Sequence, residues 1–217
     1  MKIFFVTDLH QSEKLLERIG SLASKAEILV VGGDVTTFGQ KEYFDRFMNS
    51  ISMLDLPILY VPGNNDMVDF KLPNSVQNID GKSVKLYDYM FGGLGGSPFT
   101  PFNTPNEYSE SQLSEKLNRL GKVDILVTHT PPYNSPQDTL SSGGHAGSKA
   151  VGIYIKKNKP RLVLCGHIHE AKAVSRINRS TIVNPGSASG GNYAMIELHE
   201  DIDMDIDEDE DVRLLSF

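Results

Sequence analysis

The segment ILVVGGD at residues 28–34 contains the pattern on which the fold assignment rests. Its four apolar residues, 28–31, are typical of a short strand that is buried on both faces of a sheet. Two glycines and Asp34 follow directly, and glycine beside a short polar residue is typical of a tight turn. Residues 3–6 and 58–61 have the same order, an apolar run followed by polar residues. Three buried strands are therefore predicted in the first third of the chain.

Helical patterns separate these three strands. Residues 12–23 carry apolar side chains at three- and four-residue spacing, and Ser12 is suited to cap the start of a helix. Residues 40–54 carry a stripe of aromatic and aliphatic side chains with the same spacing. The order strand, helix, strand, helix, strand predicts a parallel sheet, since each helical crossover returns the chain to the same end of the sheet.

The second half of the chain mixes helices with strands that follow one another quickly. Helices are predicted at 109–120, where Gly121 marks the end, and at 147–158. Strands are predicted at 83–88, 89–94, 123–127, 161–165, 171–176, 181–183 and 193–198. The last four leave no room for a crossover helix, which favours antiparallel pairing among them. Because no repeat or linker divides the chain, residues 1–217 are predicted to form a single domain.

The net charge is concentrated near the C-terminus. The 217 residues include 21 Lys and Arg against 28 Asp and Glu, which gives −7. Nine of these acids lie at 200–211, so 19 acids and 21 bases remain and the rest of the chain carries +2. This balance argues against a nucleic-acid-binding protein with a basic face, although a nucleotide substrate stays open. We expect a solvated acidic tip at 200–211, with a strand as the alternative; Ile206 and Val212 break the calcium-loop pattern.

The remaining composition is that of an ordinary globular protein, with 39% hydrophobic and 8% aromatic residues. One cysteine, Cys165, allows no internal disulfide and is expected to be a buried, inert thiol. No apolar run approaches the roughly 20 residues that span a bilayer. The apolar run at 3–6 is too short for the core of a signal peptide, and we therefore expect a cytoplasmic protein. The oligomeric state is not indicated.

Side chains of metal-ligand type follow five of the predicted strands. They are Asp8, His10, Asp34, Asn64, His129, His167 and His169. Because the carboxyl ends of parallel strands share one edge, we expect these side chains to converge there, the alternative being ordinary turn and cap residues. Imidazole with carboxylate oxygen suits Mn, Fe, Zn, Ni or Co. Seven ligands are too many for one tetrahedral ion and fit two divalent metal ions about 3.5–4 Å apart.

These residues form five blocks in order: Asp8-x-His10, Gly33-Asp34, Gly63-Asn64-Asn65-Asp66, His129 and Gly166-His167-x-His169. The blocks resemble those of the calcineurin-like metallophosphoesterases. The resemblance implies an α/β fold, a two-sheet sandwich flanked by helices, with a di-metal site at the carboxyl ends of strands. It also implies hydrolysis of a small-molecule phosphoester, a phosphodiester in the first instance, by a hydroxide that bridges the ions.

The resemblance further assigns the ligands. It places one ion on Asp8, His10 and His169, the other on Asn64, His129 and His167, with Asp34 between them. Asn65 stands where the family normally has a histidine that assists the leaving group, and an amide cannot act as a general acid. Asp66, the acidic partner of that histidine, is present, although both residues also suit a turn. The departure keeps open a metal-bearing scaffold or adaptor with little catalysis, and a phosphomonoesterase and a nuclease are further alternatives.

A glycine-rich segment contains the remaining candidate, His145, and leads into the helix at 147–158. Helix starts favour phosphate, so we expect His145, or the amides near Gly147 and Ser148, to contact the substrate. A solvent-exposed loop histidine is the alternative. The loop at 97–106 is long enough to indicate a function. Aromatic residues near this edge are expected more often to pack under loops than to wall a cleft, namely Phe99, Phe102, Tyr108 and Tyr133.

Overall fold

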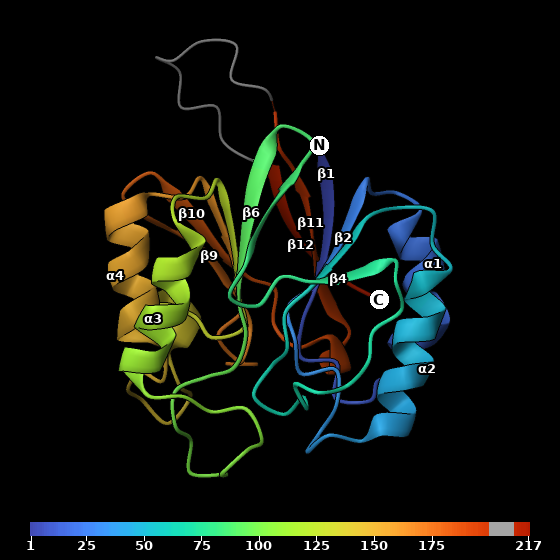
Figure 1. Ribbon diagram of the computed structural model, residues 1–217, viewed down its shortest axis with the longest axis horizontal. Helices are drawn as coiled ribbons and strands as arrows, with labels where there is room; N and C mark the ends of the chain where they lie inside the picture. The colour runs from blue at the N-terminus through green and yellow to red at the C-terminus, as the bar shows by residue number, and fades with distance from the viewer. Residues whose placement is uncertain (200–210) are drawn as a thin grey trace.

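Two mixed sheets pack face to face, with helices on both outer faces (Figure 1). The structure is a computed structural model that describes residues 1–199 and 211–217. Within these residues each sheet has six strands. The arrangement confirms the expected α/β sandwich with helices outside. Most of the acidic stretch, residues 200–210, lies outside the described residues, and only Asp211 can be placed.

The first sheet has the strand order β12-β11-β1-β2-β3-β4. Its strands β1 to β4 are parallel, β11 runs antiparallel to β1, and β12 runs antiparallel to β11. In sequence order the strands span Lys2–Val6 (β1), Ile28–Val31 (β2), Ile58–Tyr60 (β3), Val76–Asn78 (β4), Asn192–Glu197 (β11) and Asp211–Ser216 (β12). The predicted parallel order of the first three strands is confirmed.

The second sheet has the order β5-β6-β7-β8-β10-β9. The strands β6, β7, β8 and β10 are parallel, and β5 and β9 are antiparallel edge strands. They span Ser83–Leu86 (β5), Tyr89–Leu94 (β6), Ile125–Thr128 (β7), Leu162–Leu164 (β8), Ala173–Ile177 (β9) and Ser180–Asn184 (β10). Apolar side chains of both sheets form the central core, including Phe5, Val30, Phe91, Ile125 and Leu164.

Four α-helices cover the outer faces within the described residues. The helices α1 (Glu13–Ala23) and α2 (Lys41–Ser52) pack on the first sheet, and α3 (Glu110–Leu120) and α4 (Lys149–Asn158) pack on the second (Figure 1). Ser12 caps α1 as predicted, since its side chain accepts from the amide of Leu15. Gly121 ends α3 with a φ of 68°. None of the described helices is long and apolar enough to cross a membrane.

The pairing predicted for the late strands is partly wrong. β9 and β10 are antiparallel, but β8 and β10 are parallel, because β9 lies at the outer edge and β10 returns beside β8. The chain then leaves this sheet through the short helix η2 (Ala188–Gly190) and joins the first sheet at β11. The short strands β4 and β12 were not predicted, because neither carries a long apolar run.

Candidate metal centre

The predicted ligands lie at one end of the sandwich, where strands of both sheets finish. β1, β2 and β3 of the first sheet precede Asp8 with His10, Asp34 and Asn64. β7 and β8 of the second sheet precede His129 and the pair His167 and His169. The labelled strands β1 and β2 run downward in Figure 1 and end near the middle of the view, with the loops that follow them below. The site is therefore built between two sheets rather than along one edge.

The Asp8 carboxylate is buried, and one of its two oxygens has no hydrogen-bond donor. Oδ2 accepts from the hydroxyl of Thr7 at 3.0 Å and from the amide of His167 at 2.9 Å. Oδ1 makes no hydrogen bond and lies 3.3 Å from Nε2 of His169. Burial raises the pKa of Asp8, but His169 and the other nearby imidazoles outweigh this and hold the pKa well below its usual range. An ionised oxygen without a donor is the ligand that a cation needs.

Asp34 lies between the imidazoles of both sheets. Its Oδ2 is 3.6 Å from Nε2 of His10, and its Oδ1 is 3.6 Å from Nε2 of His129. Asn65 holds the carboxylate, because its backbone amide donates to Oδ1 at 2.8 Å and its side-chain amide donates to Oδ2 at 2.7 Å. Burial chiefly raises the pKa of Asp34, to about 7. A metal ion would have to displace a proton from this group near neutral pH.

His129 and Asn64 bring a ring nitrogen and an amide oxygen together. Nδ1 of His129 lies 2.9 Å from the carbonyl oxygen of Gly32, which only accepts, so Nδ1 carries a proton. In the tautomer with that single ring proton, Nε2 is the nitrogen that can bind a metal. The side-chain amide of Asn64 donates to Thr104 at 3.0 Å, which turns its Oδ1 toward His129. Oδ1 and Nε2 are 2.9 Å apart. A divalent cation near both atoms could take both as ligands.

The other three histidines complete the cluster. Nε2 of His10 and Nε2 of His169 are 3.1 Å apart, and Nδ1 of His10 contacts the Thr37 hydroxyl at 3.1 Å. His167 packs edge-to-face on His129 with a ring separation of 5.1 Å. Burial, assisted by His129, lowers the pKa of His167 to about 3, which leaves a neutral ring able to bind metal.

The donor atoms satisfy the requirements of divalent metal binding. Those of Asp8, His10 and His169 lie within 4.8 Å of one another, and so do those of Asp8, Asp34 and His129. Both groups share the carboxylate of Asp8, which has an oxygen without a donor. Burial, imidazole nitrogens and a carboxylate oxygen without a donor together fit a divalent cation of the nitrogen- and oxygen-binding class.

Two glycines allow the loops to approach the carboxylates. A Cβ atom at Gly63 would overlap Oδ1 of Asp34, and one at Gly166 would overlap Oδ2 of Asp8. Asp8, Asp34 and His167 have left-handed backbone, with φ of 55°, 49° and 70°. Such conformations are uncommon for residues with side chains and are often found at functional sites. The site thus depends on backbone geometry that the strand ends enforce.

Asp66 does not point into the site but ties two of its loops together. Its buried carboxylate accepts from the amides of Val35, Thr36 and Gly63 and from the hydroxyls of Thr36 and Tyr60, at 2.9 to 3.2 Å. These bonds join the turn after β2 to the turn after β3. Whether Asp66 contributes to catalysis stays a prediction, and its contacts point to a positioning role.

A cleft of about 820 Å³ opens over the metal ligands. One wall is the 97–106 loop, whose Phe99 and Phe102 are each 72% exposed, and Phe38 on the first sheet's side is 57% exposed. The expectation that Phe99 and Phe102 pack under loops is wrong. Glu107 anchors the loop through Thr100 and Thr104 and leaves the two rings outside. Tyr108 does pack against the core, and Tyr133 is 43% exposed.

His145 lines the same cleft, but the helix start beside it is not free to bind phosphate. The amide of Gly147 donates to Asp138, and that of Ser148 donates to the carbonyl of Pro131. The carboxylate of Glu110 accepts from the next two amides and from the Ser148 hydroxyl. The prediction that these amides contact phosphate is therefore wrong, since protein acceptors occupy them and Glu110 adds negative charge.

Several supporting residues were missed in the sequence. The hydroxyl of Ser187 donates to the carbonyl of Asp8 at 2.7 Å, and the side-chain amide of Asn184 donates to that of Ile168 at 3.0 Å. The segment joining the two sheets therefore supports the turns that carry Asp8 and His167. The sequence Asn184-Pro185-Gly186-Ser187 is typical of a turn, but nothing in it indicates contact with a residue near the other end of the chain. Cys165 is buried, as expected.

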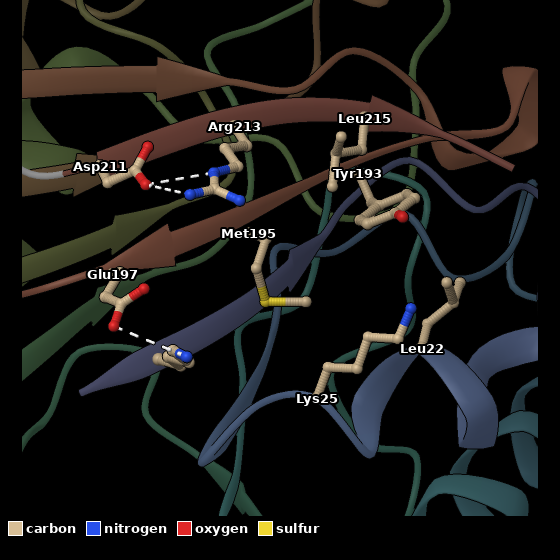
Figure 2. A pocket seen from close by; sticks show the side chains of 9 residues that line it. Leu22, Lys25, Tyr193, Met195, Glu197, Asp211, Arg213 and Leu215 are labelled. Atoms are coloured by element: carbon tan, nitrogen blue, oxygen red, sulfur yellow. Dashed lines mark hydrogen bonds and ion pairs between the residues drawn. The ribbon is translucent and has the colours of Figure 1, made fainter.

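The surface has a second hollow, of about 290 Å³, on the outer face of β11 and β12 beside α1 (Figure 2). Both of its carboxylates are paired. Arg213 donates to Asp211, and Lys2 lies 3.6 Å from Glu197. Met195, Tyr193 and Leu215 supply an apolar floor. Of the described metal-ligand groups, none lies in this hollow.

Comparison with known proteins identifies the family. A sequence model of the calcineurin-like phosphoesterase superfamily domain matches residues 1–201. The chain belongs to this family, and family membership together with the names of its relatives indicates a hydrolase of phosphoesters.

Relatives and solved structures agree with this assignment. An uncharacterized protein of Methanocaldococcus jannaschii is 38% identical over 87% of this chain and 89% of its own length. A "probable glycerophosphodiester phosphodiesterase" of Arcobacter nitrofigilis is 23% identical over 89% of this chain and 74% of its own. The crystal structure of a Thermus thermophilus protein covers 90% of this chain and 93% of its own, with a TM-score of 0.69 and 22% identity, which shows a shared fold.

Proposed function

We propose that the protein is a metal-dependent phosphodiesterase that holds two divalent ions, of Mn, Fe, Zn, Ni or Co, among its seven strand-end ligands. Oδ1 of Asp8, buried without a donor, carries the proposal. The 2.9 Å approach of Oδ1 of Asn64 to Nε2 of His129, two atoms that could both bind one ion, supports it. One ion would take Asp8, His10 and His169, the other Asn64, His129 and His167, with Asp34 between them.

The residues around these ligands have defined tasks. When bound, the ions would acidify a water and offset charge on the phosphoryl oxygens. Asn65 orients Asp34 through two hydrogen bonds, and Thr104 orients the amide of Asn64. The carbonyl of Gly32 selects the His129 tautomer that can ligate. Each contact holds a ligand atom in place before substrate arrives, which lowers the reorganisation that binding requires.

The walls of the cleft favour a diester over a monoester. A monoester dianion carries more charge, and phosphate sites commonly add Arg or Lys to bind it. Among the described residues that line the cleft there is no Arg or Lys, and Glu170 is present. Phe99 and Phe102 offer apolar surface to the second ester group that only a diester has. The name of the Arcobacter relative points in the same direction.

The test begins with protein stripped of metal and reloaded with Mn²⁺. We expect hydrolysis of bis-p-nitrophenyl phosphate, with slower turnover of p-nitrophenyl phosphate and none of single-stranded DNA. His129→Ala removes a ligand and should abolish turnover, whereas His199→Ala, at an exposed histidine outside the cleft, should leave the rate unchanged.

The opposite outcomes separate the alternatives. Faster turnover of the monoester identifies a phosphomonoesterase, and cleavage of the DNA identifies a nuclease. Stoichiometric metal binding without turnover under Mn, Ni, Co or Zn would leave a metal-bearing scaffold and refute the enzyme assignment.

A further inference from the structure

The site lacks an obvious proton donor for the leaving group. Asn65 carries an amide, and both its side-chain amide and its oxygen are engaged, with Asp34 and with the backbone amide of Phe38. The described titratable residues that line the cleft are His10, Asp34, His145, His167, His169 and Glu170. Four of these belong to the proposed metal ligands. A proton donor must therefore be sought in His145 or Glu170.

Glu170 is unsuited to donate a proton. Its carboxylate accepts from the amide and the hydroxyl of Ser141, both at 3.3 Å. An oxygen that already accepts from an amide and a hydroxyl is placed to act as an acceptor, and neither contact holds the carboxyl in a donating orientation toward the cleft.

His145 is held by a buried carboxylate. Its Nδ1 lies 2.6 Å from Oδ1 of Asp138, whose side chain is fully buried while that of His145 is 30% exposed. The backbone amides of Asn134, Ser135 and Gly147 also donate to the Asp138 carboxylate, at 2.9 to 3.0 Å. Backbone amides therefore hold the Asp138 carboxylate in place independently of its contact with His145.

This contact decides which nitrogen of His145 is available. Because a carboxylate accepts, Nδ1 carries a proton toward Asp138, and Nε2 is the nitrogen left for the cleft. The ring of Tyr133 packs against His145 with centroids 5.7 Å apart, and Lys149 lies 5.4 Å above the Tyr133 ring. A carboxylate that orients an imidazole and stabilises its protonated form is the arrangement used in acid–base catalysis.

We propose that His145, oriented by Asp138, protonates the leaving oxygen of the phosphodiester. This assignment rests on the proposed phosphodiesterase function. As the ester P–O bond breaks, its electron pair stays on the leaving oxygen, which takes the proton from Nε2 of His145. A water forms the new P–O bond, and the proton it releases restores His145. Asp138 is a positioning residue because it contacts the imidazole and not the substrate.

The dependence of the rate on the leaving group tests the assignment. A nitrophenolate leaves without protonation, whereas a phenolate or an alkoxide requires it. We expect His145→Gln, which can keep a hydrogen bond to Asp138, to lower kcat for diphenyl phosphate about 10²- to 10⁴-fold. Turnover of bis-p-nitrophenyl phosphate should stay within about threefold of wild type, because a general acid accelerates the reaction less when the leaving group is less basic. His199→Gln is the matched control and should change neither rate.

Two further measurements separate chemistry from structure. Added imidazole should restore the diphenyl phosphate rate of His145→Ala and leave that of wild type unchanged. Asp138→Asn should reduce the diphenyl phosphate rate and leave the nitrophenyl diester rate unchanged. If the metal content or Tm of Asp138→Asn also falls, the rescue of His145→Ala by imidazole is the result that tests the assignment. An equal loss on both diesters, or no loss on either, overturns the assignment. Absence of nitrophenyl diester turnover in the wild-type protein would instead refute the proposed function itself.

Discussion

The two hollows on the surface differ in how their charges are satisfied. In the hollow on β11 and β12, Asp211 accepts from Arg213 and Glu197 pairs with Lys2 (Figure 2). Beneath the cleft, Asp8 keeps an oxygen without a donor, and that oxygen lies beside the imidazole of His169 rather than beside Arg or Lys. Both hollows contain carboxylates and apolar walls. Among the described residues, the arrangement beneath the cleft is the one that could hold an additional cation.

The difference shows that burial, more than composition, marks a functional site. Asp8 and Asp34 are 1% and 2% exposed, so their charge cannot be screened by water. Asp211 and Arg213 face solvent, where an ion pair contributes little to stability. Equivalent substitutions should therefore have large effects in the cleft and small effects in the solvent-facing hollow.

The largest effect is expected from removing a ligand charge. Asp8→Asn and Asp34→Asn keep the shape of the side chain but remove the anion that binds the ions. We expect bound metal to fall below one ion per chain and turnover of bis-p-nitrophenyl phosphate to become undetectable. Metal analysis and steady-state kinetics measure both. Asp211→Asn is the matched change in the other hollow, and an equal loss there would contradict the contrast.

The second effect is a pH dependence of metal affinity. Burial raises the pKa of Asp34 to about 7, so below that pH the ion must displace a proton. His167, with its pKa lowered to about 3, is already neutral and releases none. Contact with Asp8 outweighs burial and raises the pKa of His169, so this ligand must also lose a proton. We therefore expect Mn²⁺ affinity to fall at least tenfold for each pH unit below 7.

Titration calorimetry between pH 5.5 and 8 measures this slope, once the protein has been shown to stay folded over that range. The stability of the metal-free protein measures it less well, because two groups have opposite effects on the free energy of unfolding. Between about pH 4 and 6.5, Asp34 makes folding less favourable as pH rises, whereas His167 makes it more favourable. A flat metal affinity across the range would contradict the placement of Asp34 at the metal.

The third effect concerns the orientation of one ligand. Thr104→Val keeps the side-chain shape but removes the oxygen that accepts from the Asn64 amide. The amide is then free to turn its nitrogen toward His129, and we expect metal affinity to fall about tenfold. Thr181→Val, at a threonine of β10 outside the cleft, serves as the control. Unchanged affinity in Thr104→Val would show that Asn64 is not a ligand.

The smallest effect is expected from the apolar wall. Phe99→Ser or Phe102→Ser should raise KM for bis-p-nitrophenyl phosphate about fivefold with kcat unchanged, because each ring offers only partial burial to the aryl group. Tyr87→Ser removes an aromatic residue that is 51% exposed and lies outside the cleft, and it should leave KM unchanged. A change in kcat instead would indicate that the loop positions the reacting groups.

Much of the fold follows from local patterns. The buried strands β1, β2 and β3 and the helices α1 and α2 were predicted because their periodicity is set by residues close in sequence. The parallel pairing of β8 with β10 was missed, because it depends on where β9 is placed. That residues 1–217 form one domain stays a prediction.

The sequence alone determined which residue types follow the strands, and therefore the family, because a strand end delivers its next residues to one edge. Only the tertiary structure decided which acceptor atoms lack a hydrogen-bond donor, which histidine contacts Asp138, and which backbone amides donate to Glu110. Ser187 supports Asp8 across 179 residues of chain. Hydrogen-bond partners so distant are set by packing of the two sheets, and no local pattern records them.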